Sequence, residues 1–291
     1  MKFINLEQGS PEWHAHRRNH ANASEAGCVM NCSPWKPDSW LQLWRIKNGQ
    51  DEIVQNHAMR RGIEREAITR QWASEKYRID FQPAVVVDDD GWMSASLDGI
   101  SPDGSVILEV KNTSNTSDTW KAALIGRIEP NYLAQVQEQL LVSVAIRCLF
   151  VVDNGIDTPI AIHVISDPEY QELLIHEWKR FWTHMTDFSP PETGANDITP
   201  MDGPEWDVAV SQYRVANVCL KDAEKASEEA RKALVAMCGE NHACQGCGLR
   251  VRQNYRRGSV EYSKVPELAG IDLNRYRKDG SVVWTINEIK G

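Results

Sequence analysis

The chain has 291 residues, 42% of them hydrophobic, and a formal net charge of -9, which suffices for one large or two ordinary domains with substantial cores. No apolar run approaches the ~20 residues of a membrane span, and the N-terminus lacks a signal-peptide pattern. Seven cysteines without a regular framework are typical of a reducing cytoplasm, so we expect a soluble cytoplasmic protein. The acidic balance does not favour non-specific DNA binding, although a basic channel or a metal ion can supply local positive charge.

Residues 1–188 have the pattern of one α/β domain. Helical periodicity covers Ser10–Arg18, Ser24–Met30, Ser39–Asn48, Met59–Lys76, Asn131–Ser143 and Pro168–Met185. Strand patterns cover Ala84–Val87, Trp92–Ile100, Val106–Lys111, Ile146–Val152 and Ile160–Ile165. Alternation of helices and strands in this order predicts a sheet flanked by helices.

The rest of the chain has a different character. Residues 189–205 are rich in Pro and Gly and predict a linker. Trp206 to about Cys238 predicts a long amphipathic helix, whose apolar stripe needs a second element or a partner to cover it. Gly248–Gln253 and Ser259–Tyr262 predict a hairpin that turns at residues 256–258, with arginines around it. Both a DNA-contacting arm and a solvated surface hairpin fit this segment, so the role of residues 206–291 stays open.

The segment from Trp92 to Lys111 predicts a β-hairpin with a metal site. Its turn, Ser101-Pro102-Asp103-Gly104, suits a type I turn. If Ile100 pairs with Ser105, Asp98 faces Ile107 and lies diagonal to Glu109 on the same face, at roughly 7–8 Å. Two carboxylates at that separation can converge on one divalent cation.

Magnesium suits such a site because it binds one or two carboxylates, keeps several waters and accepts substrate phosphate oxygens. The carbonyl of Val110 is available as a further ligand. Lys111 would lie next to the cation, where an ammonium can hold the attacking water or stabilise charge on a phosphoryl oxygen. The structural alternative is a surface hairpin with an ordinary Glu-Lys ion pair.

Asp98, Glu109 and Lys111 form the pattern Asp-x10-Glu-x-Lys, the signature of the PD-(D/E)XK nuclease class, with Leu97 where the class name has Pro. Flanking segments narrow the resemblance. These are residues 8–17 followed by Ala23-Ser24-Glu25, then Gly62-x3-Glu66, then residues 132–137. In this order they resemble the motifs of the phage lambda exonuclease and YqaJ-like viral recombinase family, over approximately residues 6–185.

The resemblance implies a PD-(D/E)XK, restriction-endonuclease-like core, a central mixed sheet flanked by helices. It implies that Asp98 and Glu109 bind metal, that Glu66 assists a second ion, and that two Mg²⁺ ions bind per site, with Mn²⁺ as a substitute. Lys111 would be the catalytic lysine and Gln135 would line the site. Arg17 and Ser24 would hold a 5′-terminal phosphate. Glu64 gives an alternative register for the motif, but the glycine spacing favours Glu66.

The resemblance also implies a function. Members of this family digest double-stranded DNA from 5′ ends in phage-type homologous recombination, often as a ring-shaped oligomer. They pass the exposed strand to a single-strand annealing protein. For this chain it implies a trimer or tetramer in the cytoplasm of a bacterial host. Two alternatives remain at this point: another PD-(D/E)XK nuclease, RecB-like or structure-specific, and a non-catalytic DNA-binding protein.

The C-terminal cysteines require a separate interpretation. Cys238, His242, Cys244 and Cys247 could bind zinc or an iron–sulfur cluster. All four lie within ten residues, whereas a structural zinc site normally joins two such knuckles across a longer loop. Free thiols are therefore the favoured interpretation.

Overall fold

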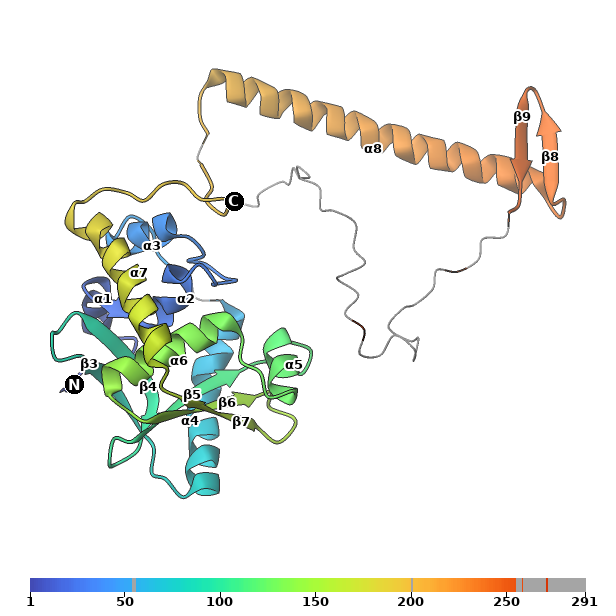
Figure 1. Ribbon diagram of the computed structural model, residues 1–291. Coiled ribbons are helices and arrows are strands. Elements are labelled where there is room, and N and C mark those ends of the chain that lie inside the picture. Colours follow the sequence, from blue (N-terminus) through green and yellow to red (C-terminus); the bar gives the residue numbers. More distant parts are fainter. Residues whose placement is uncertain (54–55, 200, 255–257, 259–270, 272–291) are drawn as a thin grey trace. The chain divides into compact units, whose positions relative to one another are not determined.

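The computed structural model in Figure 1 describes residues 1–53, 56–199, 201–254, 258 and 271. The chain divides into two compact units, Met1–Pro200 and Met201–Gly291. Among the described residues, no helix is both long enough and apolar enough to span a membrane.

A mixed sheet of seven strands organises the first unit. Its order is β1-β3-β4-β5-β6-β7, with β2 beside β4. The strands are β1 (Lys2–Ile4), β2 (Ala21–Asn22), β3 (Gln82–Val87), β4 (Met93–Ile100), β5 (Val106–Asn112), β6 (Arg147–Asp153) and β7 (Ile160–Ile165). The β5–β6 and β2–β4 pairs are parallel and the others antiparallel. The predicted α/β class with a central mixed sheet is confirmed.

Helices cover both faces of this sheet (Figure 1). They are α1 (Pro11–Arg18), the 3-10 turn η1 (Ala23–Glu25), α2 (Ala26–Val29), α3 (Trp40–Lys47), α4 (His57–Tyr77), α5 (Asp118–Leu124), α6 (Pro130–Ser143) and α7 (Pro168–Thr186). Every predicted helix and strand of this unit is present, except that the segment Ser24–Met30 is divided between η1 and α2. The short elements β1, β2 and α5 were not predicted.

The alternation of β5 fixes which side chains reach the site. Ile107 packs in the larger core cluster, which also contains Leu140 of α6 and Trp178 of α7. Leu108 packs in the smaller cluster with Ala73 of α4. Because side chains alternate along a strand, Glu109 and Lys111 point to the same side as Ile107, toward α6.

Part of the predicted linker packs on the first unit. Pro191 is buried, and the hydroxyl of Ser39, at the start of α3, donates a hydrogen bond to the Asp197 carboxylate. The side-chain amide of Gln42 donates to the main-chain carbonyl of Asn196 at 3.2 Å. Residues 191–197 therefore extend the first unit.

The second unit contains α8 (Pro204–Cys238), β8 (Ala243–Gly246) and β9 (Leu249–Arg252). The long helix is present as predicted. The hairpin differs, because β9 pairs with β8, which precedes it in the chain. Cys247 and Gly248 between them have φ angles of 47° and 78°, as a two-residue hairpin turn requires. The predicted second strand, Ser259–Tyr262, lies outside the described residues.

Candidate active site

The β4–β5 hairpin has a different register from the predicted one. Ile100 pairs with Ile107 and Gly99 with Leu108, so the predicted pairing of Ile100 with Ser105 is wrong. The turn does form, with the Gly104 amide donating to the Ser101 carbonyl at 2.9 Å. Extending the observed register places Asp98 across from Glu109 rather than diagonal to it.

The loop chemistry explains the shift of two residues. The Asp103 carboxylate accepts hydrogen bonds from the Ser105 amide at 3.0 Å and from its hydroxyl at 2.9 Å. Ser105 is thereby held in the loop and cannot pair with Ile100. The first ladder bond beyond the loop joins the Ser101 amide to the Val106 carbonyl at 2.9 Å.

A bulge lies next to Asp98 on the other side of β4. Ala84 pairs with Leu97 and Gln82 with Ile100, so β4 has one more residue than β3 in this stretch. A bulge of this kind redirects side chains and is common beside active sites. The carboxylate of Asp98 accepts a hydrogen bond from the Val110 amide at 2.7 Å, which fixes it against β5.

Glu109 is 2% exposed and anchors a cluster of side chains. Its Oε1 atom lies 2.5 Å from Nζ of Lys111 and accepts a hydrogen bond from Gln135 at 2.8 Å. Its Oε2 atom accepts a hydrogen bond from Gln139 at 2.6 Å. Lys111 also donates to Oε1 of Gln135 at 3.1 Å. The structure thus brings Glu109, Lys111 and Gln135 together, and Gln139, which the sequence analysis missed, joins them.

The electrostatics of this cluster favour a bound cation. Burial raises the pKa of Asp98 well above its ordinary value, and the nearby charges of Glu109 and Glu66 raise it further. Burial lowers the pKa of Lys111, but Glu109 and Asp98 outweigh it and the net pKa is raised. Lys111 and Arg70 supply two positive charges beside the three carboxylates of Asp98, Glu109 and Glu66, so a divalent cation would relieve the remaining repulsion.

Glu66 lies beside the hairpin. Its carboxylate is 2.7 Å from Nη1 of Arg70, and the same nitrogen donates to the carbonyl of Asp98 at 2.8 Å. Glu64 is exposed to solvent. The contacts thus connect Glu66 to Asp98, although its role toward a second metal ion stays a prediction.

The donor set fits magnesium. No three His, Cys, Asp or Glu side chains of the described residues already stand at metal-binding geometry. Mg²⁺ needs only one or two carboxylates, because waters and substrate phosphate complete its coordination. Asp98 and Glu109 supply these, and both carboxylates are held in place, Asp98 by the Val110 amide at 2.7 Å and Glu109 by the side-chain amides of Gln135 and Gln139 at 2.8 and 2.6 Å.

Arg17 and Ser24 are also brought together. Nη2 of Arg17 donates to the hydroxyl of Ser24 at 2.8 Å, and the guanidinium lies 4.5 Å from the ring centroid of Trp13. The indole of Trp13 donates to the hydroxyl of Ser96 at 2.9 Å. This contact ties α1 to β4 two residues before Asp98.

A cleft of about 1880 Å³ extends from Arg17 to Glu66. Arg17, Trp13, Glu66 and Arg70 are among its lining residues. Asp98 connects to the cleft through its hydrogen bond from Arg70. Arg17, one of the two predicted phosphate-binding residues, and Glu66 therefore line the same cleft.

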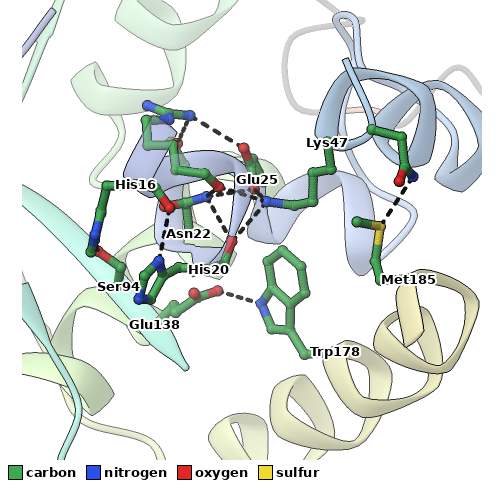
Figure 2. A network of polar contacts seen from close by, with 12 residues as sticks. His16, His20, Asn22, Glu25, Lys47, Ser94, Glu138, Trp178 and Met185 are labelled. Atoms are coloured by element: carbon green, nitrogen blue, oxygen red, sulfur yellow. Dashed lines mark hydrogen bonds and ion pairs between the residues drawn. The ribbon is translucent and has the colours of Figure 1, made fainter. Parts of the chain in front are cut away.

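Two features were missed in the sequence analysis, and only the first of them has a signal in the sequence. Gln139 follows Gln135 by one helical turn, a spacing that places both on one face of α6, so this signal was available. Figure 2 shows the second feature, a buried polar network that includes Asn22, Glu25 and Lys47. No short-range spacing connects Lys47 to Glu25.

The C-terminal cysteines do not form a metal site among the described residues. Cys238 contacts Cys244 through a hydrogen bond, whereas Cys247 is exposed. His242 instead contacts the side chain of Gln253 at 3.1 Å. All seven cysteines are free of disulfide bonds.

Residues 12–145 match the family model described as the YqaJ-like viral recombinase domain. The fold is similar to that of the alkaline exonuclease LHK-Exo from Laribacter hongkongensis. In its complex with dAMP, that protein has a TM-score of 0.55 and 21% identity, with 62% of this chain and 94% of that chain covered. A second structure of LHK-Exo gives a TM-score of 0.54, 20% identity and the same coverage. No curated protein matches the sequence. The match over residues 12–145 agrees with the family resemblance predicted from the motifs.

Proposed function

We propose that this protein is a Mg²⁺-dependent deoxyribonuclease that digests double-stranded DNA from 5′ ends during phage-type homologous recombination. The match to a YqaJ-like recombinase domain supports a nuclease role in recombination. The observation that carries the proposal is the pairing of Asp98 with Glu109 across one hairpin, with Lys111 at 2.5 Å from Glu109. The bacterial cytoplasm is the compartment that suits this role.

Asp98, Glu109 and the Val110 carbonyl would hold Mg²⁺, with Glu66 directed toward a second ion. A bound divalent ion lowers the pKa of its water and stabilises charge on phosphoryl oxygens, and Mn²⁺ accepts the same oxygen ligands. Lys111 would position the attacking water through its ammonium. Gln135 contacts both Lys111 and Glu109, so it would keep the two at a fixed separation.

Arg17 and Ser24 would bind the terminal 5′ phosphate. A guanidinium presents a planar pair of donors that matches phosphate oxygens, and the hydroxyl of Ser24 adds a third donor. Water would bond to phosphorus while the 3′ oxygen of the terminal nucleotide leaves with a proton. The shortened strand then again ends in a 5′ phosphate, which can enter the same pocket.

The decisive experiment is digestion of linear duplex DNA labelled separately at each end, with and without Mg²⁺ and a 5′ phosphate. We expect early release of the 5′ label only, dependence on Mg²⁺ or Mn²⁺, and faster digestion of phosphorylated ends. Early loss of the 3′ label, or cutting of closed circular DNA, would instead indicate a RecB-like or endonucleolytic enzyme. No hydrolysis with either ion would leave a DNA-binding role.

We also propose that the enzyme acts as a homo-oligomer, a trimer or tetramer, and that a single-strand annealing protein receives its product. The family resemblance supports both the homo-oligomer and the annealing protein as a partner. The exposed apolar side chains along one face of α8 support self-association, since Tyr213, Leu220 and Leu234 recur at multiples of seven residues and are 40%, 56% and 41% exposed. Contiguous apolar surface of this kind usually marks an interaction site.

A further inference from the structure

Lys47 is a buried cation in the last turn of α3. Its side chain is 1% exposed, which is rare for lysine unless the charge is paired. Its Nζ atom lies 2.7 Å from Oε2 of Glu25 and donates to the main-chain carbonyls of His20 at 2.7 Å and Arg17 at 3.1 Å. Figure 2 shows this side chain extended toward Glu25. All three donor positions of the ammonium are therefore used.

Glu25 connects Lys47 to Arg17. One carboxylate oxygen faces Lys47, and the other lies 3.4 Å from Nη2 of Arg17. Burial raises the pKa of Glu25, but Lys47 and Arg17 outweigh it and the net pKa is lowered. The carboxylate is thus ionised and shared by two cations, with the shorter contact to Lys47.

Asn22 completes the support. Its side-chain amide donates to the carbonyls of Arg17 and His20 and to Oε2 of Glu25, at 2.7, 2.9 and 3.0 Å. Lys47 and Asn22 therefore contact the same main-chain oxygens. Together they fix the end of α1, which carries Arg17, against the turn that carries Ser24.

The charge balance gives this network a consequence for ligand binding. Two cations surround one carboxylate, so one positive charge remains uncompensated at Arg17. Without Lys47, Glu25 would have only Arg17 as an ionic partner. The guanidinium would then pair with Glu25 more closely, and a phosphate would have to compete with that carboxylate.

We propose that Lys47 is a positioning residue of the 5′-end pocket, which neutralises Glu25 so that the charge of Arg17 stays available to a terminal phosphate. This inference rests on the proposed function, because it takes the Arg17–Ser24 pair as the phosphate site. It makes the discrimination that Arg17 exerts between phosphorylated and hydroxyl ends depend on a lysine whose ammonium is already fully paired within the protein.

The test compares Lys47→Met with the double variant Lys47→Met/Glu25→Gln in the full chain. We measure binding of 5′-phosphorylated and 5′-hydroxyl duplex by anisotropy without divalent metal, and kcat and KM on both ends with Mg²⁺. Lys47→Met should lose roughly tenfold or more of the preference for phosphorylated ends, the size of one charge-assisted hydrogen bond. The loss should be in binding and KM.

The double variant separates charge from packing. It removes the carboxylate together with its partner, so the preference should return to within about threefold of the wild type. If Lys47 acted only by holding the main-chain carbonyls of Arg17 and His20 in place, the double variant would be as impaired as the single one. Lys76→Met, an exposed lysine of α4, controls for the loss of one formal charge and should keep the full preference.

The outcomes also distinguish this inference from the proposed function. A wild type without hydrolysis or without phosphate preference would contradict the proposed pocket itself. A wild type with the preference, retained fully in Lys47→Met, would overturn only the role of Lys47. If Lys47→Met does not fold, loss of the preference in the double variant would still overturn the proposal, because the proposal requires that variant to keep it.

Discussion

At the residue scale, Asp98, Glu109 and Lys111 should be required for hydrolysis and not for folding. Asp98→Ala and Glu109→Ala remove a proposed metal ligand and with it the metal's contribution of several kcal/mol, and Lys111→Ala removes the ammonium that would position the attacking water, so each should reduce cleavage by more than roughly a hundredfold. Their effects should not add, because the residues act as a unit. Activity is measured with Mg²⁺ on linear duplex, and circular dichroism checks the fold. Mg²⁺-dependent cleavage by Glu109→Ala at the wild-type rate would contradict the site.

Arg17→Ala should act selectively on one type of DNA end. Pairing of a guanidinium with phosphate contributes ~1.5–3 kcal/mol, so digestion of 5′-phosphorylated ends should slow by roughly ten- to a hundredfold. Ends with a 5′ hydroxyl never make this contact and should be digested at nearly the unchanged rate. Because both ends are tested with one variant, misfolding cannot imitate the result. Equal slowing on both ends would assign Arg17 to general DNA binding or structure.

The buried carboxyl of Glu138 should make the free energy of unfolding depend on pH. Burial raises its pKa to about 8, against the hydrogen bond from Trp178, and its Oε1 atom has no hydrogen-bond partner. A carboxyl with a raised folded-state pKa contributes stability that is present below its unfolded pKa near 4.5 and is lost as pH rises through about 8.

Glu138→Gln should therefore make the free energy of unfolding less dependent on pH. The amide oxygen can still accept the hydrogen bond from Trp178, and no ionisation remains to be opposed by burial. We expect the variant to exceed the wild type by on the order of 1–3 kcal/mol above pH 8, and the difference to shrink toward pH 5. Urea unfolding at several pH values measures it. A wild-type profile that is equally flat would show that Glu138 does not titrate in this range.

The residue scale also shows where the sequence stops being informative. Asp98, Glu109 and Lys111 lie within one hairpin, so local spacing could group them. Lys47 and Glu25 are 22 positions apart on different elements, and neither belongs to a repeating pattern. Only the packing of α3 against α1 and η1 brings them together, so no sequence spacing could reveal the pair.

At the element scale, hydrophobic periodicity predicted helices and strands well because each has one buried face. It could not fix the hairpin register. That register depends on Asp103, whose carboxylate binds Ser105 and keeps it in the loop. Short elements such as β2 have too few residues for a period, and they form here because neighbouring segments hold them.

Gly99 shows how tightly the elements around Asp98 fit. A Cβ atom there would lie 2.8 Å from Cβ of Phe81 and 3.2 Å from Cβ of Leu108. Gly99→Ala should therefore destabilise the fold by about 1–3 kcal/mol through overpacking, and it should reduce cleavage by displacing Asp98. Thermal unfolding and duplex digestion measure the two effects.

Gly62→Ala is the matched control, since a Cβ atom at this position of α4 meets nothing within 4 Å. Alanine is favoured over glycine in a helix by ~0.8–1 kcal/mol, so this variant should be slightly more stable than the wild type. If both variants changed stability in the same direction, close packing around Gly99 would not be the cause.

At the scale of the whole molecule, the motifs predicted the unit that carries the candidate site and said little about the second unit. The family model ends at residue 145, so α8 has no motif to interpret. Its own repeat is more informative. Positions seven apart are occupied by Trp206, Tyr213, Leu220, Ser227 and Leu234, and a second series by Ala209, Ala216, Ala223, Ala230 and Met237.

These two series have the spacing of a and d positions in a coiled coil, with one polar residue among ten. A seam of this period is buried best by another helix of the same period. A second copy of α8 provides one, and alternating large and small residues could interlock across the pair. The seam thus gives the proposed homo-oligomer a specific contact that a point substitution can remove.

Leu220→Lys should therefore lower the molar mass of the full-length protein in sedimentation equilibrium at micromolar concentration, from a multiple of 33.0 kDa to a smaller multiple. Val218→Lys is the matched control. The two side chains are 56% and 59% exposed, but Val218 lies on the side of α8 away from the seam, so a lysine there should leave the mass unchanged. A monomeric wild type, or two variants that both keep the wild-type mass, would contradict self-association through α8. An equal loss of mass in both variants would place the contact on the whole helix surface rather than on its heptad seam.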